Sequence, residues 1–253
     1  MILINTLCAL LLLVCSLQLH AADLRIAAAT NLRYVLPELV SRFEGDTGQD
    51  VSVSYAASGT ITTQIQHGAP FDVFLSANPQ YIERLVNDDL TKGERIDFAQ
   101  AQIALFTSKK TDVSLDAELH GLKLALSRGK LNKVAIANPK HAPYGLAAQK
   151  ILERAGIWQL IQPHLLIAEN ASQAVQFALA SQVDVAFVPY SHMLQPKISS
   201  KGHFVKLDAL LPQQAVLIRG GSDPAELFMD FIQTEQAKVI LRAQGFVVEG
   251  KSQ

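Results

Sequence analysis

Residues 24–32, LRIAAATNL, join the apolar pattern of a short strand to a hydroxyl and an amide side chain. After Asn31 the apolar residues recur at the i, i+3, i+4, i+7 spacing of a helix with one buried face. This predicts a helix directly after the strand, with Thr30 or Asn31 as its N-cap. Pro37 lies inside the pattern, so the helix either kinks there or follows an irregular turn. A helix start exposes unpaired N–H groups and the positive end of the helix dipole, which suits a bound oxyanion. Taken alone, the pair is better explained as ordinary helix capping.

A second segment has the same layout. Residues 51–55 alternate as a strand, and Ser58, Gly59 and Thr60 come before a short helix that Gly68 ends. Ligands bind at the carboxyl ends of strands in open parallel sheets, and small residues there let a ligand approach the backbone closely. Two turns of this kind favour a ligand site over capping alone.

The two turns form part of a longer resemblance that covers nearly the whole chain after the first two dozen residues. The segments that carry it are AAATNL at 27–32, YAASGT at 55–60, GAPFDVFLSA at 68–77, NPKHAPYG at 138–145, AEN at 168–170 and QGF at 244–246. Together they closely resemble the periplasmic molybdate-binding proteins of ABC importers. The resemblance implies a two-lobed periplasmic binding protein fold of the α/β class, with a ligand cleft between the lobes. Each lobe would be a mostly parallel sheet flanked by helices.

The spacing of strand and helix patterns agrees with this architecture. Strand patterns alternate with helix patterns along the chain, which predicts parallel sheets with helices outside; they lie at 71–75, 101–107, 134–137, 165–168 and 183–188. Residues 215–218 and two following helix patterns lack a sheet of their own and must pack on an earlier lobe. We therefore expect lobe 1 to comprise 23–102 plus 215–253, and lobe 2, inserted in it, to comprise 103–214.

The composition of the chain limits its class. The chain has 253 residues, of which 49% are hydrophobic, and this is enough for one large or two medium hydrophobic cores. Its net charge of −1 argues against a nucleic-acid binder. Residues 1–22 have no charged side chain and contain an apolar run, which predicts a cleaved signal peptide and a periplasmic protein, although the usual Lys or Arg is missing. A membrane anchor or a lipoprotein at Cys15 is less well supported. Cys8 and Cys15 both lie in this leader, so the exported chain would have no disulfide and no cysteine metal site.

The resemblance also assigns an anion site, residue by residue. The hydroxyls of Thr30 and Ser58 match groups that donate to the oxyanion, and would contact the oxygens of molybdate or tungstate, not the metal itself. Asn31, Tyr144 and Ala171 match positions whose backbone N–H groups contact the anion, and the Asn31 side chain could donate as well. One branch of the family uses a tyrosine after the strand at 183–188. Here that position is Pro189 and the tyrosine is Tyr190, which we leave out of the set.

The sequence matches other functions less well. A binder of the same fold for sulfate or an organic anion is the nearest alternative, although an organic acid favours an arginine in the cleft and the nearby Arg33 is predicted to face solvent. A serine hydrolase would need a G-x-S-x-G turn, which Ser58 lacks, and the scattered histidines contain no zinc-binding pair. Among them His141 lies next to the predicted cleft. We therefore expect no enzymatic activity and no cofactor. The resemblance implies a membrane permease and its ATPase as partners, and we expect a monomer.

Overall fold

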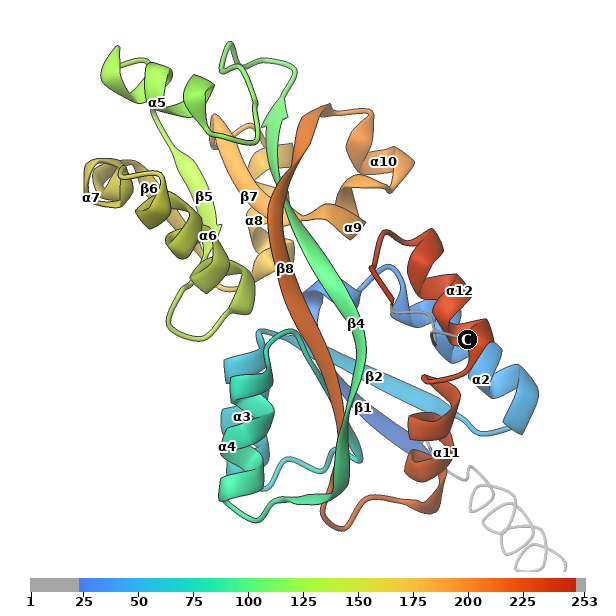
Figure 1. Cartoon of the computed structure of the whole chain (residues 1–253). Coiled ribbons are helices and arrows are strands. Elements are labelled where there is room, and N and C mark those ends of the chain that lie inside the picture. Colours follow the sequence, from blue (N-terminus) through green and yellow to red (C-terminus); the bar gives the residue numbers. More distant parts are fainter. Residues whose placement is uncertain (1–22, 249–253) are drawn as a thin grey trace, which may run out of the picture.

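The computed structural model describes residues 23–248, which form one curled eight-stranded sheet with helices on both faces (Figure 1). The strand order is β2-β1-β3-β8-β4-β7-β5-β6. The strands are β1 (Leu24–Ala29), β2 (Val51–Ala56), β3 (Val73–Ser76), β4 (Thr91–Ser108), β5 (Val134–Ala137), β6 (Leu165–Ala168), β7 (Val185–Pro189) and β8 (Gly202–Ile218). The leader predicted at residues 1–22 lies outside the described part of the chain.

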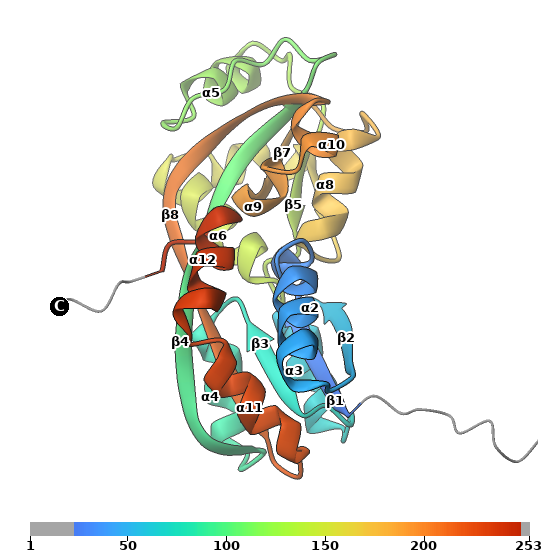
Figure 2. The same cartoon turned by 90° about the vertical axis from the view of Figure 1, so that its right-hand side faces the viewer.

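The sheet has a parallel group at each end and an antiparallel pair in the middle. Strand β1 pairs in parallel with β2 and β3, and β5 pairs in parallel with β6 and β7. We call the part of the fold around β1–β3 the first half and the part around β5–β7 the second half. Strands β4 and β8 pair with each other along their length and join the two halves (Figure 2).

Strands β4 and β8 are much longer than the sequence predicted. The patterns at 101–107 and 215–218 mark only one end of each, because residues 91–97 of β4 are mostly exposed and lack an alternating apolar face. The expected lobe crossings, near residues 102 and 214, fall inside these strands. The division into two lobes at those positions stays a prediction.

The helices cover both faces of the sheet. Their bounds are η1 (Thr30–Leu32), α2 (Leu36–Thr47), α3 (Ser58–Gln66), α4 (Pro79–Asn87), α5 (His120–Ser127), α6 (Pro143–Arg154), α7 (Trp158–Ile161), η2 (Gln162–His164), α8 (Ala171–Leu179), α9 (Tyr190–Met193), α10 (Pro196–Ser199), α11 (Asp223–Phe231) and α12 (Glu235–Ala243). The C-terminal helices α11 and α12 lie beside α2 on the first half (Figures 1 and 2), where the rings of Phe43 and Phe228 pack 5.3 Å apart.

The start of the first long helix differs from the prediction. Thr30–Leu32 is a separate single turn of 3-10 helix, and α2 begins only at Leu36, with Pro37 in its first turn. Proline has no N–H to donate and is tolerated where a helix N–H would be unpaired in any case. The irregular-turn alternative is therefore the right one, and Thr30 and Asn31 do not cap α2, whose N-cap is Val35.

Candidate functional site

Four strand ends meet where the two halves of the fold face each other. Strands β1 and β2 run into η1 and α3 of the first half, and β5 and β6 lead to α6 and α8 of the second half. The five predicted site residues lie at the starts of these helices, and all are buried: Thr30, Asn31, Ser58, Tyr144 and Ala171 are between 0% and 4% exposed.

The helix starts leave polar hydrogens without partners inside their own helices. Ala29, Ala57 and Ala142 hold the N-cap positions of η1, α3 and α6, and none of them forms a side-chain cap bond. Thr30 and Ser58 lie inside the first turns, so their hydroxyls are not used as caps, contrary to the capping expected for Thr30. The first N–H groups of a helix have no intrahelical acceptor and lie at the positive end of its dipole. These ends can therefore donate to an anion.

Ser58 is oriented by one hydrogen bond. Its Oγ accepts the backbone N–H of Ala77 at 3.1 Å. An oxygen that accepts from a backbone N–H on one side directs its own proton elsewhere. This bond also explains why a fully buried serine is tolerated at the start of α3.

A chain of amides fixes the Asn31 side chain. Gln213 Nε2 donates to the Leu211 carbonyl at 2.8 Å, so Gln213 Oε1 must accept, and it accepts from Asn31 Nδ2 at 2.9 Å. The sequence suggested that this amide could also donate to the ligand, but one of its two hydrogens is already bound to Gln213. Asn31 Oδ1 is buried and has no partner within residues 23–248.

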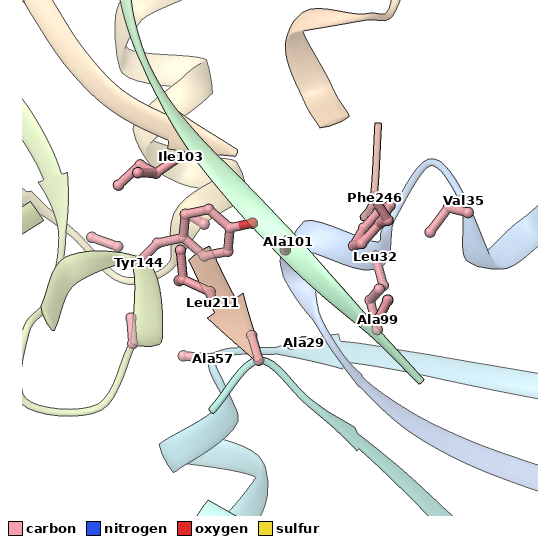
Figure 3. Packing of buried hydrophobic residues seen from close by; sticks show 14 of the residues in the cluster. Ala29, Leu32, Val35, Ala57, Ala99, Ala101, Ile103, Tyr144, Leu211 and Phe246 are labelled. Carbon is pink, nitrogen blue, oxygen red and sulfur yellow. The ribbon is translucent and has the colours of Figure 1, made fainter. Parts of the chain in front are cut away.

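Tyr144 contributes its ring to the core. The side chain extends from α6 toward β4 (Figure 3), where its hydroxyl donates to the Gln102 carbonyl at 3.4 Å. Burial raises the pKa of the Tyr144 phenol far above its usual range, and the Asn31 side chain offsets only part of that rise. The phenol is therefore neutral, and the backbone N–H at the start of α6 is the group that suits an anion.

Three further polar residues connect the halves, and sequence reasoning missed them. Ser172 Oγ donates to the Thr30 carbonyl at 3.2 Å, and His192 Nε2 lies 3.2 Å from the same oxygen. Ser191 Oγ donates to the Asn31 carbonyl at 3.3 Å. Ser172 follows the predicted Ala171 in α8 and could have been suspected. For Ser191 and His192 the local sequence offers no signal.

The environment of His192 keeps it neutral. Burial lowers its pKa to about 4, an effect that the hydrogen bonds to the backbone of Thr30 and Asn31 oppose and the nearby charge of Arg33 reinforces. A carbonyl can only accept, so Nε2 carries the proton of the neutral ring.

The carbonyl of His141 accepts the N–H of Gly59 at 2.9 Å, another contact between the halves, and His141 Nδ1 is buried without a partner in the described chain. Arg33 is exposed, as predicted, and its guanidinium lies over the Tyr55 ring at 4.8 Å. Tyr190 packs on Phe204, with 6.2 Å between ring centroids.

Residues 24–247 match the family model of the bacterial extracellular solute-binding proteins. The chain belongs to this family. It is 33% identical to the molybdate-binding protein ModA of Rhodobacter capsulatus, over 94% of each chain, and 31% identical to ModA of Azotobacter vinelandii, over 93% of each. The solved structure of the periplasmic molybdate-binding protein of Azotobacter vinelandii superposes with a TM-score of 0.80 and 28% identity, covering 90% of this chain and 100% of that one. The predicted family and the predicted periplasmic binding protein fold are confirmed. The family model and the relatives describe binding proteins.

One cluster of side chains that could hold a metal ion has a structural explanation. Asp116, Glu118 and His120 lie close together at the start of α5. The Asp116 carboxylate accepts the N–H groups of His120 and Gly121 at 2.8 and 2.7 Å, which caps that helix. Within residues 23–248, no helix has the length and apolar character needed to span a membrane.

Proposed function

We propose that the protein captures molybdate, and tungstate, between its two halves in the periplasm and delivers the anion to an ABC permease driven by an ATPase. The ligands proposed are the hydroxyls of Thr30 and Ser58 and the backbone N–H groups of Asn31, Tyr144 and Ala171. The observation that carries the proposal is the burial of all five residues at helix starts from both halves. The molybdate-binding relatives support the choice of ligand.

The physical chemistry of the donors suits a dianion. An anion that enters a buried cleft loses its water, and fixed N–H and O–H groups replace those bonds without a mobile charge. A hydrogen bond to a charged group contributes about 1.5–3 kcal/mol. Five to seven such bonds, less the cost of association, are compatible with a Kd of about 1 μM or below, which corresponds to about −8 kcal/mol.

A site that offers hydrogen-bond donors and no carboxylate also discriminates between anions. Hydrogen phosphate keeps a proton that requires an acceptor, and none of the five proposed ligands is a carboxylate. We therefore expect phosphate to bind weakly. Selection of molybdate and tungstate over the smaller sulfate would depend on the size of the cavity.

The test is calorimetric titration of the chain from Asp23 onward with molybdate, tungstate, sulfate and phosphate. The double variant Thr30→Ala/Ser58→Ala removes both hydroxyls, while Thr63→Ala is the matched control, because the Thr63 hydroxyl donates to the Gly59 carbonyl within α3. We expect tight binding of molybdate and tungstate, lost in the double variant and kept in the control. A folded wild-type protein that prefers sulfate, or binds none of the four, would overturn the proposed ligand.

A further inference from the structure

Three polar side chains of the second half act on the same turn of the first half. Ser172 of α8 and His192 of α9 reach the carbonyl oxygen of Thr30, both at 3.2 Å, and Ser191 of α9 donates to the carbonyl of Asn31 at 3.3 Å. The acceptors belong to η1 in the first half, and every donor belongs to the second half. We call Ser172, Ser191 and His192 the latch residues.

The ring of His192 is also held by the first half. The Tyr34 ring, next to η1, meets it edge to face, with centroids 4.7 Å apart and an interplanar angle of 89°. His192 is 1% exposed and Ser191 is 5% exposed. Separating the two halves would therefore break these contacts of His192.

The geometry of the peptide group connects this latch to the anion site. The carbonyl of Thr30 and the N–H of Asn31 belong to one peptide group, and in a trans peptide they point in opposite directions. The latch residues occupy the carbonyl side. The N–H side is the one proposed above to face the anion.

We propose that the Thr30–Asn31 peptide is a relay that couples closure of the protein to its affinity for the anion. This inference rests on the proposed function and adds positioning residues to it. Donors on a carbonyl polarise the peptide and strengthen the bond that its N–H makes, an effect of hydrogen-bond chains in a low-dielectric interior. The latch forms only on closure, so the Asn31 N–H becomes a better donor in the closed form.

The coupling works in both directions. An anion bound to the N–H strengthens the carbonyl as an acceptor, which favours the closed form. When the halves separate, the carbonyls of η1 and the His192 ring exchange these bonds for water, and the anion is held less tightly. The latch residues therefore control the release of the ligand without touching it.

The experiment measures molybdate binding by the chain from Asp23 onward for wild type, Ser172→Ala, His192→Leu and the double variant. At about the strength of one ordinary hydrogen bond each, a single variant should weaken binding about 5-fold and the double variant about 30-fold, mainly through faster dissociation. His192→Gln keeps an N–H donor and should recover part of the loss. Ser199→Ala is the matched control, because its hydroxyl donates to the Gln195 carbonyl inside the second half.

Two spectroscopic readouts separate the relay from a general loss of structure. The chain after the leader has no cysteine, so dyes on cysteines introduced at the exposed positions Asn87 and Gln159 report closure by energy transfer. The amide proton of Asn31 should shift downfield on adding molybdate, and less so in the double variant. Thermal melting without ligand confirms that each variant is folded.

The possible results are distinguishable. Unchanged affinity and dissociation rate in a folded double variant would overturn the relay alone. Failure of the wild-type protein to bind molybdate would overturn the proposed function and the relay with it. If the double variant binds molybdate more weakly, but its Asn31 amide proton shifts on binding as far as in the wild type, the relay is not the cause of the weaker binding.

Discussion

Replacing Gly59 with alanine should keep the two halves of the protein from closing fully. A Cβ atom at Gly59 would lie 2.8 Å from both the Cβ and the carbonyl oxygen of His141, which belongs to the opposite half. These distances are shorter than carbon atoms tolerate, and two of the three nearest atoms are backbone. The N–H of Gly59 also donates to that carbonyl at 2.9 Å. The substitution therefore affects the closed form directly.

The size of the effect follows from these contacts. Overpacking costs about 1–3 kcal/mol, and loss of the hydrogen bond about 1 kcal/mol more. If the anion binds the closed form, the substitution weakens the apparent binding free energy by as much as it destabilises the closed form relative to the open form. We expect molybdate to bind about 30-fold to several hundred-fold more weakly. The separate first half should not suffer, because alanine is favoured over glycine in a helix by about 0.5–1 kcal/mol.

Calorimetric titration and thermal melting test both parts of this expectation. Gly45→Ala is the matched control: Gly45 lies in α2, and a Cβ there would meet nothing within 4 Å. The control should bind molybdate like the wild type. In the absence of ligand, Gly59→Ala should melt at or slightly above the wild-type temperature. Wild-type affinity in Gly59→Ala would refute the reasoning, since binding would then not require the contact between the halves.

Asp72, His192 and Gln213 can each be probed by one substitution or by a change of pH. Burial raises the pKa of the Asp72 carboxyl, but hydrogen bonds from Arg25 and from backbone N–H groups outweigh it and hold the pKa below its usual range. Asp72 therefore stabilises the fold above about pH 4 and loses this effect as the pH falls through its lowered pKa. Asp72→Asn should lower the free energy of unfolding in urea by about 2–3 kcal/mol at pH 7, a modest amount because Arg25 is partly exposed. The variant should also lose less stability in acid than the wild type, because it has no carboxyl group to protonate. The pKa of His192 is lowered to about 4, against about 6.5 for an exposed histidine, so its contribution to closure should be complete above pH 6.5 and weaken toward pH 4. Molybdate affinity should therefore fall about tenfold from pH 7.5 to 5.5. An equal fall in His192→Gln would contradict this cause. Gln213→Leu removes the acceptor that orients the Asn31 side chain and should weaken molybdate binding about 5-fold or more, in a protein that still melts cooperatively. An unchanged Kd would show that binding does not depend on this orientation of Asn31.

Local pattern predicted two short strands with their observed bounds. The pattern at 134–137 matches β5, because a strand covered on both faces is a continuous apolar run. The pattern at 165–168 matches β6, although this strand lies at the edge of the sheet and its Ile167 is exposed. The exposed part of β4 has no such run, so only its buried end was found. The pattern also left open where the first helix begins, since Pro37 is compatible with a kink or with a first turn.

Some residues of the site can be predicted from a local pattern, and others cannot. A hydroxyl at a strand end followed by a helix, as at Ser58, is visible in a few neighbouring residues, and the resemblance supplied the matching positions from the other half. Thr30 and His192, in contrast, are 162 positions apart in the chain, and they meet only because β4 and β8 bring one half over the other. A lone histidine after a strand looks the same whether it faces solvent or the carbonyl of another half. The residues that sequence reasoning missed are therefore those that hold one half against the other, and the proposed relay through the Thr30–Asn31 peptide depends on them.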